Sequence, residues 1–195
     1  MRIVITGGPS VGKTTIVSLL QAQGYPVVHE QATQIIKEGR FLPWVDRPAF
    51  QAEVLRRQLE AEAQVIDSGR PVFLDRGLFD GEAYYIYDKL EIPPAFGALD
   101  ASRYALALLI EELPFFEANE VRRENLEFTR EITEILDRCY SSRQVQVVRV
   151  KAMPAAERVD FVLATVRRHA GPVARPVTAL VARSAQAVAV VAATP

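Results

Sequence analysis

The stretch that decides the fold is GGPSVGKT, residues Gly7–Thr14, which has the form G-x-x-x-x-G-K-T. It follows an apolar run, Ile3–Thr6, that predicts a buried strand, and it leads into Thr15–Leu20, which predicts a helix. The alternative is an ordinary glycine-rich turn that happens to precede Lys-Thr, and the flanking strand and helix argue against it. A loop of this pattern in this context predicts a site that binds the phosphates of a nucleoside triphosphate.

Each position of the loop has a physical task. Glycine lets the backbone bend so that its N–H groups approach an anion, and a helix beginning near Lys13 adds free amides and the positive end of its dipole. Lys13 is expected to reach the β- and γ-phosphates, and the Thr14 hydroxyl is expected to bind Mg²⁺. The expected nucleotide-binding residues are Gly7, Gly8, Pro9, Ser10, Val11, Gly12, Lys13, Thr14 and Thr15.

Size and composition fit one globular domain. A chain of 195 residues with 49% hydrophobic and 24% charged residues can bury the core of a five-stranded sheet. A net charge of −1 argues against nucleic acid or a membrane surface as a partner, and no apolar run approaches the roughly 18–20 residues that span a bilayer. The single cysteine, Cys139, fits a reducing cytoplasm, and a first strand that runs into the phosphate loop does not resemble a signal peptide. We therefore expect a cytoplasmic protein; the sequence leaves its oligomeric state open.

Strand and helix patterns alternate along residues 1–168, which we take as one P-loop domain. Strands are predicted over 2–6, 27–29, 72–75, 104–110 and 145–150. Helices are predicted over 13–22, 31–37, 48–67, 81–88, from just after Arg123 through Cys139, and over 154–168. The fold class is therefore α/β: a P-loop NTPase with a five-stranded parallel sheet, helices on both faces and a short lid. Residues 169–195 are rich in Ala and Val without clear periodicity, and we expect a poorly ordered tail there.

Ligands of parallel sheets bind at the carboxyl ends of the strands, where Asp75 and Arg76 are expected to lie. Asp75 ends the apolar run Val72–Leu74 and is a candidate to hold Mg²⁺; an ordinary strand-end Asp is the alternative. Arg76 could clamp the acceptor or the transferring phosphoryl group, or could be a surface arginine.

Two polar residues follow the second predicted strand. Glu30 could orient an acceptor hydroxyl and accept its proton, or could simply begin the next helix. His29 is expected to be packed or hydrogen-bonded near the end of the sheet; a metal or catalytic role is the alternative, and it is less favoured because no second His lies nearby.

Arginines after the fourth strand form a third set. Arg122 and Arg123 lie in a charged segment, Glu111–Arg123, that we expect to be a loop, and they are candidates to close over the phosphates. Arg130 is a weaker candidate for the same task. The neighbouring acidic residues, among them Glu112, could instead pair with these arginines on the surface.

Other conspicuous residues favour packing over chemistry. Phe79, Tyr84, Tyr85 and Tyr87 could stack on a ring of a ligand, but each is more typical of a core or contact residue. Cys139 lies on the apolar face of its predicted helix, which predicts a core position.

Absent motifs narrow the class of nucleotide-binding protein. The chain has no Asn-Lys-x-Asp or Thr-Lys-x-Asp, by which signalling GTPases read guanine, and no Leu-Ser-Gly-Gly-Gln, which marks transporter ATPases. It is also too short for a ring-forming AAA+ module with its helical subdomain. A compact kinase-like domain remains.

Four blocks of sequence together resemble the NadR-like AAA-type P-loop domain family: Gly7–Thr14, Val28–Glu30, Phe73–Gly77 with Asp80, Gly81 and Tyr84 after it, and Val121–Arg123. That family contains many small bacterial proteins described as predicted ATPases and the ribosylnicotinamide kinase part of NadR. The resemblance covers about residues 1–168. It implies a five-stranded P-loop fold that binds ATP with Mg²⁺ and transfers a phosphoryl group to a small acceptor. The 195 residues hold no counterpart of the adenylyltransferase domain of longer NadR enzymes, so no nicotinamide substrate follows.

The leading hypothesis is therefore a Mg²⁺-dependent ATPase or small-molecule kinase. Lys13 and the loop amides would hold the phosphates, Thr14 and Asp75 the Mg²⁺, and Glu30 the acceptor, while Arg76, Arg122 and Arg123 would stabilise the transferring charge. The alternative is a binding or regulatory module that responds to ATP or GTP with little catalysis. Neither the acceptor nor the choice of ATP over GTP follows from these residues.

Overall fold

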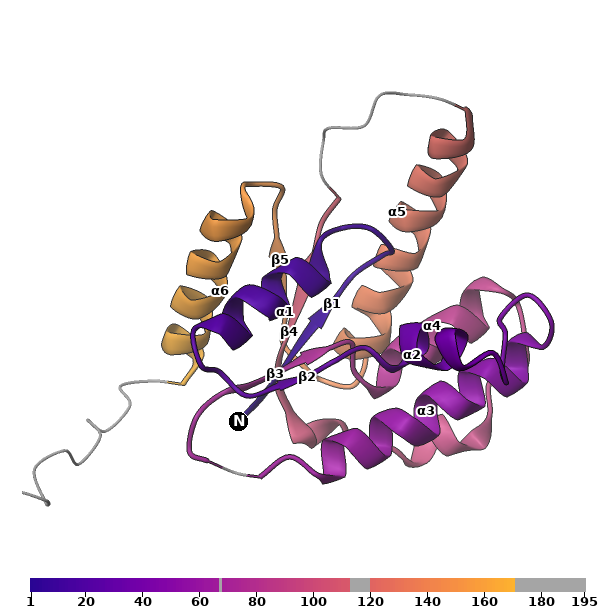
Figure 1. Ribbon diagram of the computed structural model, residues 1–195, viewed down its shortest axis with the longest axis horizontal. Coiled ribbons are helices and arrows are strands. Elements are labelled where there is room, and N and C mark those ends of the chain that lie inside the picture. Colours follow the sequence, from indigo (N-terminus) through magenta and orange to yellow (C-terminus); the bar gives the residue numbers. More distant parts are fainter. Residues whose placement is uncertain (67, 113–119, 171–195) are drawn as a thin grey trace, which may run out of the picture.

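A parallel sheet forms the centre of the molecule. The computed structural model describes residues 1–66, 68–112 and 120–170, and for 120–126 it describes the backbone alone. The strands are β1 (Arg2–Thr6), β2 (Val27–Val28), β3 (Val72–Asp75), β4 (Tyr104–Ile110) and β5 (Val147–Val150). They pair in the order β2-β3-β1-β4-β5, and every pair is parallel (Figure 1). The predicted α/β class with a five-stranded parallel sheet is confirmed, whereas part of the segment expected to form a short lid lies outside the described residues.

Helices cover both faces of this sheet. They are α1 (Lys13–Ala22), α2 (Gln31–Glu38), α3 (Arg47–Ala63), α4 (Leu78–Tyr87), α5 (Glu120–Ser141) and α6 (Ala155–His169), with the short 3₁₀ helices η1 (Pro94–Ala98) and η2 (Ala101–Arg103). Helices α1 and α6 pack on one face, whereas α3, α4 and α5 pack on the other (Figure 1).

The two cores follow from the alternation of side chains along the buried strands. Ile3 and Ile5 of β1 are fully buried against the face covered by α1 and α6, whereas Val4 is fully buried against the opposite face. Both faces are apolar, so the strands read as nearly continuous hydrophobic runs in the sequence. This burial leaves only the ends of the strands for polar chemistry.

Several element boundaries differ from the sequence-based prediction. Helix α4 begins at Leu78 and not at Gly81, because the Asp80 carboxylate accepts a hydrogen bond from Gly77 N at 3.0 Å and caps the helix. Helix α5 begins at Glu120, so the backbone of Arg122 and Arg123 belongs to a helix and not to the predicted loop. Strand β5 begins at Val147, because Val145 N bonds to Tyr140 O in the preceding turn.

The carboxyl-terminal part of the chain is described as far as Ala170. Helix α6 ends at His169, one residue beyond its predicted end. The expected tail, apart from His169 and Ala170, lies outside the described residues. Among the helices described, none combines the length and the apolar character needed to cross a membrane.

A sharp corner after β3 sets the shape of the polar end of the sheet. Arg76 adopts a left-handed backbone conformation with φ of 73°, and the next residue, Gly77, packs directly on the core. A Cβ atom on Gly77 would lie 2.6 Å from the Tyr140 hydroxyl oxygen and 3.2 Å from Cζ of Tyr104. The corner therefore requires glycine for space rather than for backbone freedom.

We expect Gly77→Ala to lower the free energy of unfolding by about 1–3 kcal/mol, because the added methyl group overpacks this site. Gly97→Ala is the matched control, since a Cβ there would meet nothing within 4 Å. Urea unfolding of both variants measures the difference. Equal free energies of unfolding for the two variants would contradict this prediction, because they would show that the corner accommodates the added methyl group.

Candidate phosphate-binding site

The loop between β1 and α1 has the backbone of an anion cradle. Gly7 and Gly12 adopt φ values of 138° and 93°, which side chains with a Cβ rarely adopt. Gly12 is the N-cap of α1, and it provides no side-chain cap for the first amides of the helix. Those N–H groups and the positive end of the helix dipole therefore face the loop, an arrangement that attracts phosphate.

Lys13 lies inside this loop with only 6% of its surface exposed. Its Nζ donates a hydrogen bond to Gly8 O at 2.6 Å. Burial and, after it, the charge of Arg76 lower the pKa of Lys13 from 10.5 to about 7, although Asp75 and Glu30 act in the opposite direction. An anion bound beside Lys13 would raise its pKa and favour its charged form.

Thr14 and Asp75 meet although 61 residues separate them. The Thr14 hydroxyl donates to Asp75 Oδ2 at 2.8 Å. The other carboxylate oxygen, Oδ1, is buried without a hydrogen-bond partner, and burial raises the pKa of Asp75. A hydroxyl beside a carboxylate with a free oxygen is a donor set that Mg²⁺ accepts, so these residues fit the predicted metal.

Arg76 and Glu30 form an ion pair beside Lys13. Arg76 Nε donates to Glu30 Oε1 at 2.6 Å, and the Thr33 hydroxyl donates to Glu30 Oε2 at 2.7 Å. Burial alone would raise the pKa of Glu30, but Arg76 and these hydrogen bonds outweigh it and leave the pKa below its usual value. Glu30 is therefore a carboxylate with a reduced affinity for protons.

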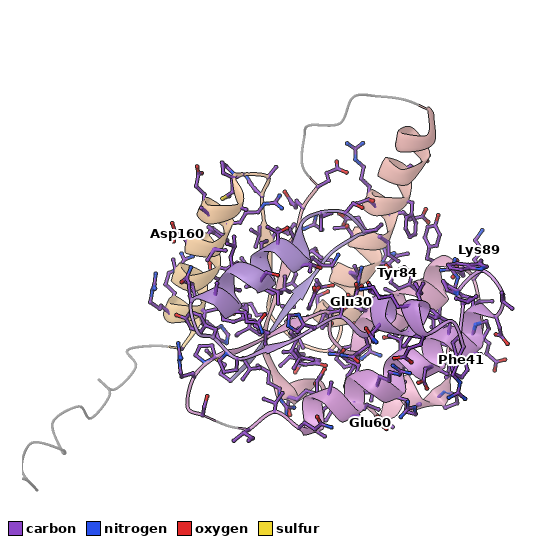
Figure 2. The ribbon with its side chains drawn as sticks, viewed as in Figure 1. Glu30, Phe41, Glu60, Tyr84, Lys89 and Asp160 are labelled. Carbon is purple, nitrogen blue, oxygen red and sulfur yellow. The ribbon has the colours of Figure 1, made fainter. Side chains whose placement is uncertain are left out.

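The guanidinium of Arg76 also lies over an aromatic ring, 5.7 Å from the centroid of Tyr84. The Arg76 guanidinium thus contacts both Glu30 and Tyr84, which are labelled in Figure 2. A cavity of about 320 Å³ opens here, lined by Pro9, Ser10, Gly12, Lys13, Thr14, Thr15, Glu30 and Arg76. The structure thus brings together the loop, the metal candidate and the acceptor candidate that the sequence predicts separately.

Asp80 is a site residue to which the sequence analysis assigned no role. Its carboxylate accepts hydrogen bonds from the Thr6 hydroxyl at 2.7 Å and from the Tyr140 hydroxyl at 2.6 Å. It also accepts from Arg76 Nη1 at 3.1 Å and is 3% exposed. In the sequence, Asp80 could have been recognised only as an acidic residue three positions after Gly77, a spacing that suits a helix cap. Its partners Thr6 and Tyr140 are 74 and 60 residues away in the sequence, so these contacts leave no local pattern.

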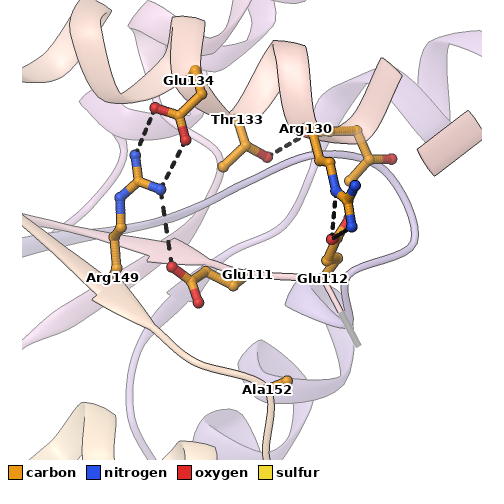
Figure 3. Close-up of a pocket in the computed structure, with 8 residues that line it drawn as sticks. Glu111, Glu112, Arg130, Thr133, Glu134, Arg149 and Ala152 are labelled. Atoms are coloured by element: carbon orange, nitrogen blue, oxygen red, sulfur yellow. Dashed lines mark hydrogen bonds and ion pairs between the residues drawn. The ribbon is translucent and has the colours of Figure 1, made fainter. Parts of the chain in front are cut away.

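A second, larger cavity of about 520 Å³ opens between β4, β5 and α5 (Figure 3). It is lined by Glu111, Glu112, Thr129, Arg130, Thr133, Glu134, Arg149 and Ala152. Arg130 pairs with Glu112 at 2.8 Å, as in the surface-pair alternative for this segment, and Arg149 pairs with Glu134 at 2.8 Å. This cavity adjoins the phosphate loop, because a Cβ on Gly8 would lie 2.6 Å from Thr129 Cγ2.

The remaining predicted residues divide into three outcomes. The side chains of Arg122 and Arg123 lie outside the described residues, so their closing role stays a prediction. His29 is exposed, so the expectation that it packs near the sheet was wrong. Cys139 is buried, and burial raises its pKa to about 12, which confirms a core position.

The aromatic candidates are mainly packing residues. Phe79 and Tyr85 are buried in the core. Tyr84 and Tyr87 pack on Phe128 of α5, with ring centroids 6.4 and 4.7 Å apart. In the described part of the chain, no group of three or more His, Cys, Asp or Glu residues is arranged to hold a metal ion.

Comparisons with known proteins bear on the family and the fold of the chain. A family model described as an AAA domain matches residues 2–158. NadR in complex with NR superimposes with a TM-score of 0.69 at 21% identity, and NadR in complex with NAD and AMP-PNP with 0.66 at 20%. Shikimate kinase from Aquifex aeolicus superimposes with a TM-score of 0.54 at 20% identity. No curated protein sequence matches the chain.

The extent of these matches differs. The alignments cover 87% and 89% of this chain but 50% and 51% of the two NadR chains, so the chain spans about half the length of NadR. The shikimate kinase alignment covers 87% of this chain and 98% of that enzyme. At these identities the likeness establishes the fold alone, which is the α/β fold of P-loop NTPases.

The buried lysine predicts a pH-dependent stability. The folded-state pKa of Lys13, about 7, lies below its unfolded value of 10.5, so the unfolded chain binds the extra proton between these pH values. The free energy of unfolding should therefore rise with pH across this window, by at most about 1.4 kcal/mol per pH unit. Lys13→Met should be the more stable protein near pH 6, and its advantage should shrink toward pH 10. Urea unfolding at several pH values tests this, and a constant difference would contradict it.

Proposed function

The chain belongs to the AAA domain family whose model spans residues 2–158, and we propose that it binds Mg·ATP and transfers the γ-phosphoryl group to a small hydroxyl acceptor or to water. The observation that carries this proposal is the Thr14–Asp75 pair, with its buried unpartnered carboxylate oxygen beside Lys13. Phosphates in the loop would give Lys13 an anionic partner, and Mg²⁺ would give Asp75 Oδ1 a cationic one. A single bound Mg·ATP would thus offset the energetic cost of burying both the Lys13 ammonium group and the Asp75 carboxylate.

The phosphate loop and its neighbours supply the electrostatics of the reaction. The amides at the start of α1 and the Lys13 ammonium group would hold the phosphates, and Mg²⁺ on Thr14 and Asp75 would neutralise the charge that develops on them. The cavity beyond Thr129 offers space at the same end of the sheet for the nucleoside part. Arg122 and Arg123 would approach the phosphates from the first turns of α5.

Glu30 would orient the acceptor. Its low pKa makes it a weak base, but phosphoryl transfer needs mainly a hydroxyl held in line with the phosphate, and an ionised carboxylate can accept that hydroxyl's hydrogen bond. Arg76 would then stand between the carboxylate and the transferring group. Positioning, rather than strong base catalysis, is the expected contribution of this pair.

One observation favours the alternative of a nucleotide-dependent binding module. Both oxygens of Glu30 already accept hydrogen bonds, from Arg76 and Thr33, so an acceptor would have to share them. Under this alternative the protein would bind ATP or GTP, turn it over slowly, and use no small acceptor.

Nucleotide binding is tested by calorimetry with Mg·ATP and Mg·GTP. We expect the wild type to release heat on binding, with ATP preferred, and Lys13→Ala to lose both binding and turnover because the phosphates lose their ammonium partner. Lys37→Ala, which removes an exposed lysine on α2, is the matched control and should bind as the wild type does. A well-folded wild type that binds neither nucleotide would refute the proposal.

Acceptor transfer is tested by incubating labelled ATP with nucleosides and vitamin-like alcohols. With an accepted compound, Glu30→Gln should lower the transfer rate about 100-fold while the affinity for ATP stays within about twofold, because the amide lacks the negative charge that holds Arg76 and strengthens the hydrogen bond from the acceptor hydroxyl. Glu38→Gln alters a carboxylate at the other end of α2 and should leave the transfer rate unchanged. Unchanged transfer by Glu30→Gln would remove Glu30 from the mechanism, and the absence of any accepted compound would favour the binding module.

A further inference from the structure

Glu62 is a fully buried carboxylate in a place that does not suit a carboxylate. It lies in the last turn of α3, where the helix dipole is negative, and it is 0% exposed. The nearest cationic groups, Arg103 Nη1 at 3.6 Å and Arg2 Nη1 at 4.0 Å, are too distant for strong hydrogen bonds, and Oε2 has no hydrogen-bond partner. Burial raises the pKa of Glu62. Local stability therefore does not explain why a carboxylate occupies this position.

The other oxygen of Glu62 organises two hydrogen-bond chains. Oε1 accepts from the Tyr104 hydroxyl at 2.7 Å and from Gln58 Nε2 at 3.0 Å. The same Gln58 nitrogen donates its second hydrogen to Arg76 O at 3.1 Å. The same Tyr104 hydroxyl accepts from Leu78 N at 2.9 Å. Both chains thus end on the corner at residues 76–78, one on each side of Gly77.

This corner has a backbone that needs to be held. Arg76 has a φ of 73°, which residues other than glycine adopt rarely, and its side chain must reach Glu30 from there. Asp80 holds the corner from α4 through Gly77 N and the Arg76 guanidinium. The chains from Glu62 hold the same segment from α3 and β4, at the carbonyl of Arg76 and the amide of Leu78.

We propose that Glu62 is a positioning residue for Arg76, acting through Gln58 and Tyr104. It fixes the left-handed corner and so sets where the guanidinium lies relative to Lys13 and Glu30. The inference rests on the proposed function, because it gives Arg76 a task in phosphoryl transfer. Glu62 itself touches neither the loop nor the cavity.

Tyr104→Phe is the primary test. It removes the hydroxyl that joins Glu62 to Leu78 and keeps the ring that packs on Phe79 and Tyr140. We expect Mg·ATP turnover (kcat) to fall about 10-fold, with KM for ATP within about twofold, because the phosphate loop is untouched. Glu62→Gln should lower kcat less, since an amide oxygen can still accept from Tyr104 and Gln58.

Glu82→Gln is the matched control. Glu82 is also a buried carboxylate, and its side chain pairs with Arg143 at 2.9 Å rather than with residues 75–78. It should lose stability without a change in kcat. Equal losses of kcat in Glu82→Gln and Tyr104→Phe would overturn the proposal, because general loosening would then explain both.

A double-mutant cycle shows whether the effect passes through Arg76. In an Arg76→Gln background, adding Tyr104→Phe should change turnover by less than about twofold, because the group being positioned is gone. The same 10-fold loss in both backgrounds would overturn the proposal. A structural defect alone would give that additive result.

A readout without turnover separates this inference from the proposed function. Arg76 Nε–H is bonded to Glu30, so its NMR signal should exchange slowly with water in the wild type and in Glu82→Gln, and faster in Tyr104→Phe. Slow exchange in Tyr104→Phe would refute the positioning role, whatever the protein does with ATP. A wild type with slow exchange but no Mg·ATP binding would refute the proposed function alone.

Discussion

The hydrogen bond between Thr14 and Asp75 depends on one feature of the sheet, the pairing of β1 with β3. The register sets Ile5 beside Asp75, so the loop that follows β1 and the residue that ends β3 open at the same level. A two-residue slip would move Asp75 about 7 Å along the strand and out of reach of α1. Every other contact of the site is built on that alignment, because Arg76 and Asp80 follow Asp75 in the chain.

This alignment gathers charges that protein interiors normally exclude. Lys13, Asp75, Asp80 and Arg76 are buried or nearly so, and Glu30 adjoins them. Each is tolerable only because its neighbours have the opposite charge, and the pairing is incomplete at Asp75 Oδ1 and at the Lys13 ammonium group. Under the proposed function, a metal–polyphosphate complex would complete these two pairs, and part of the energetic cost of burying them would then contribute to its affinity.

The sequence predicts the residues that line this site but not those that hold them in position. The predicted site residues lie at or just after strand ends, and a parallel sheet brings those ends together, so short motifs suffice to place them. They are Gly7–Thr14, Glu30, Asp75 and Arg76. Asp80 accepts a hydrogen bond from Tyr140, 60 positions away, and Glu62 accepts one from Tyr104, 42 positions away. Tertiary packing alone brings such partners together. The packing expected for His29 was wrong because β2 ends at Val28, so His29 lies beyond the strand and is exposed. The predicted start of α4 was wrong because glycine is typical of loops, and the capping hydrogen bond between Gly77 N and Asp80 was not anticipated.

Helix α5 connects the phosphate loop with the arginines that follow β4. Gly8 packs so closely on Thr129 that a methyl group would not fit between them, and Thr129 lies six residues after Arg123 in one continuous helix. Six residues of α-helix span about 9 Å, so the backbone of Arg123 stands that far along the axis from the loop contact. A loop would leave the backbone of these arginines without a fixed position relative to Gly8. Because their backbone belongs to α5, its position is set by the packing of this helix on the phosphate loop at Gly8 and Thr129.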